Sequence, residues 1–392
     1  MKRTHPVAPL LILLAGCGGE AGPGSSPMVT TDTLPNGTVV TRNPAVGDGD
    51  ARPLSVDLRI GRAYGDGPDL FGRVADVEVD GYGRIYVLDD IAHEIRVFNA
   101  DGSHLRTIGG SGNGPTEFSR PTGLAWGPEW QLWIEDTRNN RYSVFDTTGA
   151  LLATHPRRLS SRGFRWTGSF DREGHLYIEN MKFSPERVHR WLTRNDAGLT
   201  ATDSIPLPHY EQEAYELVED GVTMAAAMVP FSGRQFWRVA PDGTLWFGIT
   251  DQYRLFQRAM AGEMLRVVEL ETDPIAVTAA ERDSALDDEF LADMIERGAE
   301  VDPARIPAHR PAWKTFTVDE LDRLWVIAEL ESGDSTTLDA FDSEGKHIGR
   351  LTLPVRLAAS SLLVRAGHIY GVTLDAFDVA YVVRAPFELE PG

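Results

Sequence analysis

One sequence pattern returns at a fixed distance, and it limits the fold of this chain more than any other feature. The segment Gly65–Phe71 reads GDGPDLF, and Gly112–Phe118, which lies 47 residues later, reads GNGPTEF. The same offset of 47 joins further identical or similar residues: Arg73 and Arg120, Tyr86 and Trp133, Asp89 and Asp136, and Gly102 and Gly149. So many matches at one offset indicate an internal structural repeat.

Each repeat is predicted to be a meander of four short strands. In the first repeat, Asp80 and Gly81 supply a tight turn, and the β-branched and aromatic residues of the next strand, 84–89, follow it. Weaker copies place one aromatic marker in each of six units: Tyr86, Trp133, Tyr177, Trp246, Trp325 and Tyr370. Six such units predict an all-β fold, a six-bladed β-propeller over residues 53–392. The alternative, a β-sandwich, has no reason to repeat its sequence blade by blade.

The markers are unevenly spaced, which predicts two insertions in the ring. Successive gaps are 47, 44, 69, 79 and 45 residues, so the extra residues lie at about 209–235 and 276–311. In the second insertion, Thr278 to Glu281 reads as a helix-capping box, and an apolar stripe continues the helix to about Arg297. In the first, apolar residues between Tyr210 and Val218 favour a short helix. Both helical insertions are expected either to decorate the propeller or to form a lid over a pocket at its channel mouth.

The repeat also predicts how the ring closes. Residues 58–61 precede the first Gly-Pro turn as residues 106–109, an outer strand, precede the second. We therefore expect the N-terminal strand, 54–60, to complete the last blade beside residues 379–383, which removes an open seam.

Part of the repeat resembles a known family. The segments 121–125, 132–136 and 139–141 resemble an NHL repeat, and the G-x-G-P-x-x-F element resembles bacterial six-bladed propeller lipoproteins of that type. The match is close over residues 54–150 and looser beyond. The resemblance implies a propeller and a binding role, and it does not imply one particular reaction.

The first residues predict export and lipid anchoring. Residues 1–16 resemble a signal peptide, with an apolar stretch too short to span a bilayer, and Leu-Ala-Gly before Cys17 resembles a bacterial lipobox. We expect cleavage before Cys17 and lipidation of its thiol, because this lone cysteine has no internal disulfide partner. The alternative is an ordinary secretory signal with an incidental cysteine. Gly18, by resemblance to proteobacterial sorting, favours the outer membrane, so the expected location is the cell envelope.

The composition of the chain supports two further predictions, a flexible tether and the exclusion of certain partners. Residues 17–52 are rich in Gly, Pro, Ser and Thr and are predicted to form a flexible tether, with Thr38–Thr41 as a candidate short strand. The net charge is −20, from 38 Lys and Arg against 58 Asp and Glu. A surface this negative repels phosphate backbones, so nucleic acid is not expected as a partner, and neither is a polybasic membrane anchor.

An arginine cluster is the first candidate ligand site. On an acidic chain, four arginines lie close together beside one tryptophan: Arg157, Arg158, Arg162, Arg165 and Trp166. Guanidinium groups bind carboxylates, phosphates or sulfated sugars through paired hydrogen bonds. The alternative is that these arginines pair with the surplus of surface carboxylates.

Strand-end acids are the second candidate. Asp89, Asp136 and Asn180 each lie three residues after a marker aromatic, and Asp251, Glu329 and Asp375 fall slightly later in their units. Such a set could form a ring of oxygen ligands for Ca²⁺ around the channel. The alternative is that each caps its own turn. Nothing in the sequence requires a cofactor or metal.

The sequence thus favours a lipid-anchored envelope protein that binds a small molecule, glycan, peptide or protein partner on one propeller face. We find no nucleophile elbow, catalytic cysteine or zinc-binding histidine pair in it. The rival hypothesis is a calcium-dependent lactonase or lyase with its site in the channel. A third is a purely structural envelope protein that docks through its blade edges.

Overall fold

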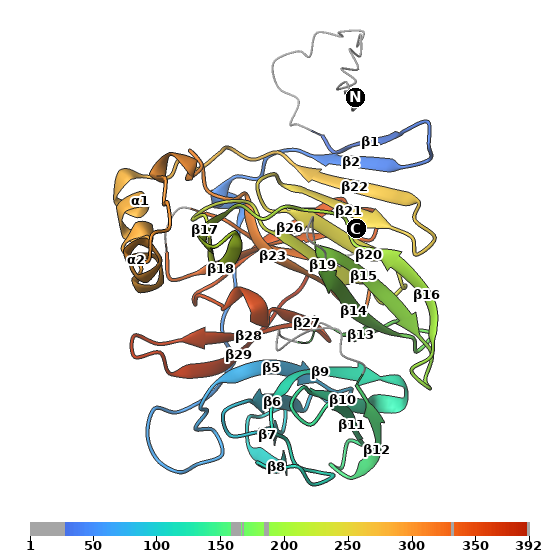
Figure 1. The fold of residues 1–392 in the computed structure, drawn as a ribbon. Helices are drawn as coiled ribbons and strands as arrows, with labels where there is room; N and C mark the ends of the chain where they lie inside the picture. The colour runs from blue at the N-terminus through green and yellow to red at the C-terminus, as the bar shows by residue number, and fades with distance from the viewer. Residues whose placement is uncertain (1–27, 158–165, 167, 184–187, 331–332, 390–392) are drawn as a thin grey trace, which may run out of the picture.

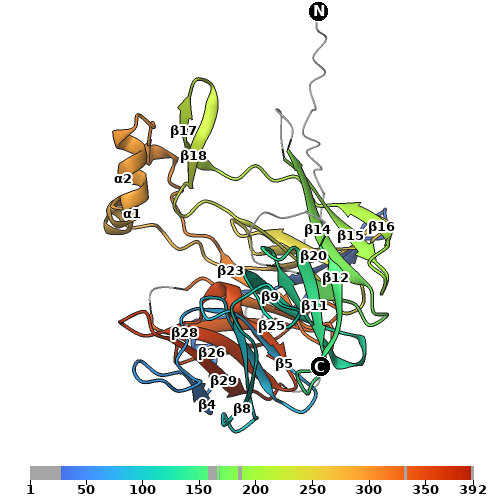
Figure 2. The same cartoon turned by 60° about the horizontal axis from the view of Figure 1, so that its bottom comes forward.

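The first three blades are four-stranded antiparallel meanders (Figures 1 and 2). The computed structural model describes residues 28–157, 166, 168–183, 188–330 and 333–389. Blade 1 contains β5 (Val74–Val79), β6 (Ile85–Asp89), β7 (Glu94–Phe98) and β8 (His104–Gly109). Blade 2 contains β9 (Pro121–Gly127), β10 (Gln131–Asp136), β11 (Arg141–Phe145) and β12 (Leu151–Pro156). Blade 3 contains β13 (Ser169–Phe170), β14 (Leu176–Phe183), β15 (Val188–Asn195) and β16 (Ala201–Pro206).

The last three blades each take in strands from the N-terminal segment. Blade 4 contains β19 (Gln235–Val239), β20 (Leu245–Ile249), β21 (Arg254–Arg258) and β22 (Met264–Leu270). Blade 5 contains β23 (Trp313–Val318), β24 (Leu324–Ala328), β25 (Thr336–Phe341) and β26 (His347–Leu353). Blade 6 contains β27 (Leu363–Arg365), β28 (His368–Leu374), β29 (Ala380–Pro386) and β4 (Leu58–Ile60). Short 3-10 turns are η1 (Asp48–Asp50), η2 (Pro128–Trp130), η3 (Pro303–Arg305) and η4 (Ala359–Ser361). The prediction of a six-bladed β-propeller is confirmed.

The hydrophobic core is divided among the contacts between neighbouring blades. Strand β24 is buried along its whole length because its blade has a neighbour on each face. Alternate side chains serve the two sides: Leu324 and Val326 pack toward blade 4, whereas Trp325 and Ile327 pack toward blade 6. Each remaining pair of adjacent blades, including blades 6 and 1, shares a cluster of the same kind. This two-sided burial explains why the repeat carries unbroken apolar runs.

The ring closes as the sequence predicts. Strand β4 pairs with β29 in antiparallel register, with Ile60 opposite Val382 and Leu58 opposite Arg384. Ile60 is buried in the cluster between blades 6 and 1. The outer strand of the last blade therefore comes from the start of the propeller.

The predicted tether is shorter than expected, because residues from Thr30 onward form strands along the ring. Strand β1 (Thr30–Thr33) pairs with β2 (Val39–Asn43), which lies parallel to β22 of blade 4. Strand β3 (Arg52–Pro53) lies parallel to β26 of blade 5, and β4 follows in blade 6. This strap (residues 30–60) contains the predicted Thr38–Thr41 strand. The signal peptide, Cys17 and the rest of the tether lie outside the described residues.

The two insertions differ, and the prediction of a helix in the first is wrong. Residues 209–235 contain a β-hairpin, β17 (Ala214–Glu219) and β18 (Val222–Met228). The second insertion contains both helices, α1 (Ala279–Leu286) and α2 (Glu289–Glu296), and the capping box of Thr278 and Glu281 is present. Within the described residues, no helix is both long and apolar enough to cross a membrane.

Candidate functional site

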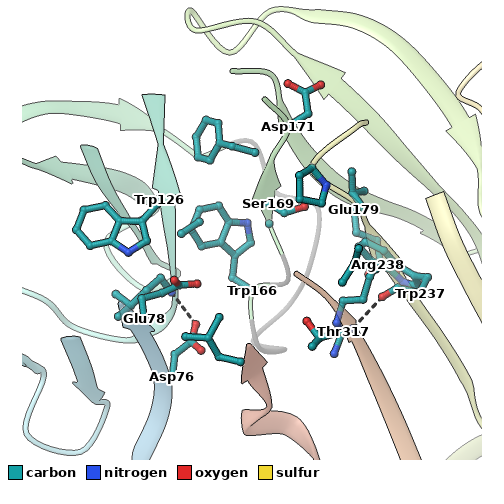
Figure 3. Close-up of a pocket in the computed structure, with 18 of the residues that line it drawn as sticks. Asp76, Glu78, Trp126, Trp166, Ser169, Asp171, Glu179, Trp237, Arg238 and Thr317 are labelled. Atoms are coloured by element: carbon teal, nitrogen blue, oxygen red, sulfur yellow. Dashed lines mark hydrogen bonds between the residues drawn. The ribbon is translucent and has the colours of Figure 1, made fainter. Parts of the chain in front are cut away.

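A channel of about 1410 Å³ lies at the centre of the ring. All six inner strands, β5, β9, β13, β19, β23 and β27, contribute residues to its wall. Ligand pockets commonly occupy some hundreds of Å³ up to roughly 1,000 Å³, so this channel can admit a ligand of several rings. Figure 3 shows Trp126 and Glu78 on one side of it, with Trp237 and Arg238 opposite.

Indole rings form the largest apolar surfaces of the channel. Trp166 is 6% exposed and packs on Tyr142 with ring centroids 5.4 Å apart. Gly168 allows this placement, because a Cβ there would lie 2.1 Å from the indole of Trp166. Trp126 packs edge-on against Tyr86 at 5.0 Å. Tight packing fixes these rings and leaves the aromatic wall preorganised.

Several polar groups on the same wall have no protein partner among the described residues. They are the indole N–H groups of Trp126 and Trp166 and the hydroxyls of Ser169 and Thr315. Buried polar groups are normally satisfied, and an unpaired one costs about 1–3 kcal/mol. A ligand or ordered water in the channel could complete these hydrogen bonds.

Charged side chains stand beside the aromatic wall in pairs. The Glu179 carboxylate contacts Arg190 at 2.5 Å, and Glu78 lies 3.7 Å from Arg365. Arg238 donates to the carbonyl oxygen of Trp237 at 2.8 Å. The wall therefore offers both hydrogen-bond donors and acceptors within one mixed-charge surface.

One channel mouth carries an exposed aromatic residue held in a costly backbone conformation. Trp130 is 39% exposed and has a φ of 57°, and Glu129 before it has a φ of 56°. Left-handed backbone is unfavourable for residues with a side chain, and such strain gathers at functional sites. Trp126 packs against the Trp130 ring, and the Arg365 guanidinium lies 5.1 Å from its centroid. This packing holds Trp130 at the lip of the channel.

The predicted arginine cluster is only partly described. Arg157 is buried and bonds to the buried carboxylate of Glu135 at 2.6 Å. Glu135 lines the channel, as does Trp166. Burial and the nearby Glu135 carboxylate raise the pKa of the Tyr142 hydroxyl, so it stays protonated at neutral pH. Arg158, Arg162 and Arg165 lie outside the described residues.

The predicted strand-end acids serve their own turns. Asp89 accepts backbone N–H groups from Gly72, Arg73, Ile91 and Ala92. Asp136 accepts those of Ser119, Arg120 and Asn139. Asn180 donates within its own sheet, to the Ile178 carbonyl and the Thr193 hydroxyl. These contacts match the alternative in which each residue caps or braces local backbone.

The ring of calcium ligands, the other possibility for these acids, does not form among the described residues. Among the residues that the structure describes, no three His, Cys, Asp or Glu side chains come together as a set that could hold a metal ion. Asp89 and Asp136 already use their oxygens on backbone donors. The available residues therefore do not fit the calcium site on which the lactonase or lyase hypothesis depended.

The insertions do not form the expected lid. Both leave the ring between an outer strand and the next inner strand, so they emerge on one face as predicted. The hairpin and the helices instead pack on each other around Tyr215, Val229 and Leu291. Within the described part of the chain, neither β17–β18 nor α1–α2 lines the channel.

Sequence reasoning missed most of the channel wall. Trp126, Glu78 and Arg238 lie on inner strands, next to the apolar residues that carry the repeat. Their types do not recur at the repeat offset. One sequence signal could have identified these residues. Each is a bulky aromatic or charged residue in an inner strand whose other residues are small or apolar, and it therefore departs from the repeat.

Comparisons with known proteins agree on the architecture. Residues 69–152 match the model of a family described as a 6-bladed beta-propeller. No curated protein matches the chain. Among solved structures, a protein classed as exported, from Bacteroides fragilis, has a TM-score of 0.51 at 10% identity, covering 89% of this chain and 100% of that one.

Two further solved structures are similar at lower scores. A member of the duf4221 family from Bacteroides vulgatus has a TM-score of 0.47 at 10% identity, covering 86% of this chain and 98% of that one. A gluconolactonase from Xanthomonas campestris has a TM-score of 0.41 at 10% identity, covering 81% and 88% respectively. At such identities the likeness to the B. fragilis protein supports the propeller fold and carries no activity with it.

Proposed function

We propose that this protein is an exported, lipid-anchored component of the cell envelope that binds an oligosaccharide in its central channel. The observation that carries the proposal is the channel wall itself. Preorganised indole rings stand there beside carboxylate and guanidinium pairs and beside buried donors without protein partners.

Carbohydrate is the ligand chemistry that uses all of these groups. A sugar ring has apolar C–H faces that stack on indole, and a rim of hydroxyls that both donate and accept hydrogen bonds. Trp126 and Trp130 offer accessible ring surfaces, and Glu179 with Arg190 offers complementary polar partners. A purely apolar ligand would leave the charged pairs and the unpartnered indole N–H groups unused.

Envelope location is supported by the N-terminal sequence and by the strap. The segment before Cys17 has the order of a lipoprotein signal peptide. The strap fixes the chain to the edge of blade 4 from Thr30 onward. The dozen residues between Cys17 and Thr30 can span at most roughly 40 Å, so the lipid would hold blade 4 near the membrane. The exported protein from B. fragilis is consistent with this location.

Tryptophan fluorescence can test channel binding with defined sugars. The probes are cello-, malto- and chito-oligosaccharides, together with the acidic oligogalacturonates. Trp126→Phe keeps an aromatic ring but removes the indole N–H and part of the stacking surface. Trp191→Phe, on β15 and away from the channel lining, is the matched control.

We expect at least one sugar class to bind the wild-type protein and the Trp191→Phe variant alike. Trp126→Phe should weaken that binding about tenfold, the loss of one hydrogen bond and part of one stacking contact. The proposal fails if none of the sugars binds, or if the two variants bind with the same affinity.

A further inference from the structure

The two insertions form a unit of their own on one side of the ring (Figure 2). Hairpin β17–β18 and helices α1 and α2 share a small hydrophobic cluster that includes Tyr215, Val277 and Ile306. Two contacts lock the hairpin to the second insertion: the Tyr215 hydroxyl donates to the Asp302 carbonyl oxygen at 2.9 Å, and Arg305 bonds to Glu213 at 2.6 Å. We call these two segments, 209–235 and 276–311, the insertion unit.

One face of the hairpin is buried and the other exposes apolar side chains. Tyr215 lies in the cluster, Ala227 packs against it, and Leu217 is also buried. The opposite face carries Met224 and Met228, which are 55% and 45% exposed. Other exposed apolar residues of the unit are Val218, Val222, Phe290 and Ile295. Contiguous exposed apolar residues on a soluble domain are typical of an interaction surface.

The hairpin also presents an open strand edge. The Val229 N–H donates to the Glu213 carbonyl oxygen, which makes these two a hydrogen-bonded pair of the hairpin ladder. Because such pairs alternate along antiparallel strands, the backbone groups of Ala226 and Met228 point away from β17, up to the register shift at Met224. The sheet has two strands only, so β18 has no neighbour on that side among the described residues. An unpaired edge is a template for another strand.

The insertion unit carries a large excess of negative charge. Its residues include fourteen acidic side chains, five arginines and no lysine. Glu216 and Asp220 lie on the hairpin and form no ion pair among the described residues. An apolar strand edge within a negative field favours a partner whose own strand is flanked by basic residues.

We propose that β18 of the insertion unit binds a partner protein by strand addition, the incoming strand being apolar on one face and flanked by Lys or Arg. Main-chain hydrogen bonds to Ala226 and Met228 supply affinity, and the Met224 and Met228 side chains supply an adaptable apolar contact. Flanking basic residues meet the acidic rim. This proposal is independent of what the channel binds.

Other occupants fit this surface less well. An anionic lipid surface would be repelled by the acidic rim that surrounds the methionines. A second copy of the same chain carries a net charge of −20 and presents the same acidic unit. Both occupants are nevertheless outcomes that the experiment can detect.

The test uses purified full-length protein and two synthetic peptides with the same alternating valine–threonine core. One peptide has two lysines at each end, and the other has two glutamates. Ala226→Pro removes one outward N–H without removing a bond to β17, whereas Ala226→Val keeps that N–H and is the matched control. A second variant, Met224→Lys with Met228→Lys, alters side chains alone. Melting temperatures verify that each variant is folded.

We expect the lysine-flanked peptide to bind at least tenfold more tightly than the glutamate-flanked one, with the difference shrinking as salt rises. Ala226→Pro and the double lysine variant should each weaken binding at least tenfold, and Ala226→Val should not. Equal binding of the two peptides, or equal affinity of the Pro and Val variants, would overturn the proposal. So would vesicle binding or dimerisation that the double lysine variant abolishes, because either would assign the surface to a lipid or to a second copy.

Discussion

Trp325 donates its indole N–H to the Asp319 carboxylate over 2.9 Å, and this bond fixes the turn between β23 and β24. The other carboxylate oxygen accepts the backbone N–H groups of Leu321 and Arg323. The same arrangement joins Tyr86 to Asp80 and Tyr177 to Asp171, and in each case the two residues are six positions apart. In these three blades the aromatic marker of the repeat therefore fixes the turn that precedes the second strand.

Removing the Asp319 carboxylate should destabilise the propeller. Asp319 is buried, and its four donors, including Arg323 at 2.7 Å, would lose their acceptor in Asp319→Ala. We expect a loss of about 2–4 kcal/mol in the free energy of unfolding, measured by urea denaturation. Asp375→Ala is the control, because Asp375 makes the same turn pattern with Tyr381 but is only partly buried. If Asp319→Ala lowers the free energy of unfolding no more than Asp375→Ala does, burial of the carboxylate does not increase its contribution to stability.

The ring was predictable because its signals are local and repeated. Turn aspartates, marker aromatics such as Tyr86, and the outer strand seen at 58–60 recur from unit to unit, so each copy supports the others. The hairpin of the first insertion was not predictable in this way. Met224–Met228 has good helix formers, yet packing of Tyr215 and Ala227 against the second insertion selects strands. In this segment, tertiary contacts outweighed the intrinsic helix propensity of the residues.

The sequence did not predict the pairing of the strap or the residues of the channel wall, and the reason there is different. Residues 39–43 pair with a strand more than two hundred positions away, and no local sequence pattern predicts such a parallel pairing. Channel residues such as Trp126 and Arg238 differ from blade to blade, because a binding site needs different groups on its different sides. A sequence repeat identifies the structural positions that the blades share. It gives no information about the positions at which the blades differ.

Asn43 should be the most sensitive single position of the strap. Its side-chain amide donates to the Glu269 carbonyl of blade 4 and the Gly345 carbonyl of blade 5, at 3.0 and 2.9 Å. Its side-chain oxygen accepts the His347 N–H at 2.8 Å. Asn43→Ala leaves these buried groups unpaired, so we expect a loss of about 2–4 kcal/mol in the free energy of unfolding. Asn36→Ala, in the exposed β1–β2 turn, should cost far less in the same thermal and urea measurements; similar losses would show that the strap contributes nothing specific.

Lipid anchoring has a direct test at Cys17. Cys17→Ser removes the only thiol to which the expected lipid could attach. We expect the wild-type protein in the membrane pellet after cell fractionation and the variant in the soluble envelope fraction, with an unchanged melting temperature. Ser25→Ala, eight positions later in the chain, is the control and should remain in the pellet. A Cys17→Ser variant that still pellets completely would refute the lipoprotein assignment.

Asp339 should make the stability of blades 4 and 5 depend on pH. Although burial opposes ionisation, hydrogen bonds from His347 and Arg350 lower the pKa of Asp339 below its ordinary value of 3.8. Arg350 bonds to it at 2.7 Å, and the Tyr253 hydroxyl donates to it at 2.7 Å from blade 4. Because the pKa is lower in the folded state, the stabilisation is complete above the unfolded value and is lost as the pH falls through the folded one.

The matching experiment compares wild type with Asp339→Asn by urea denaturation at several pH values. At pH 7 the variant should be less stable by about 3–5 kcal/mol, because it loses the buried ion pair between Asp339 and Arg350. Between about pH 5 and pH 2 the wild type should progressively lose this advantage while Asp339→Asn, which cannot titrate at that position, changes less. The difference between the two proteins should therefore shrink as the solution becomes more acidic. A difference that stays constant over this range would show that Asp339 titrates alike in the folded and unfolded chains.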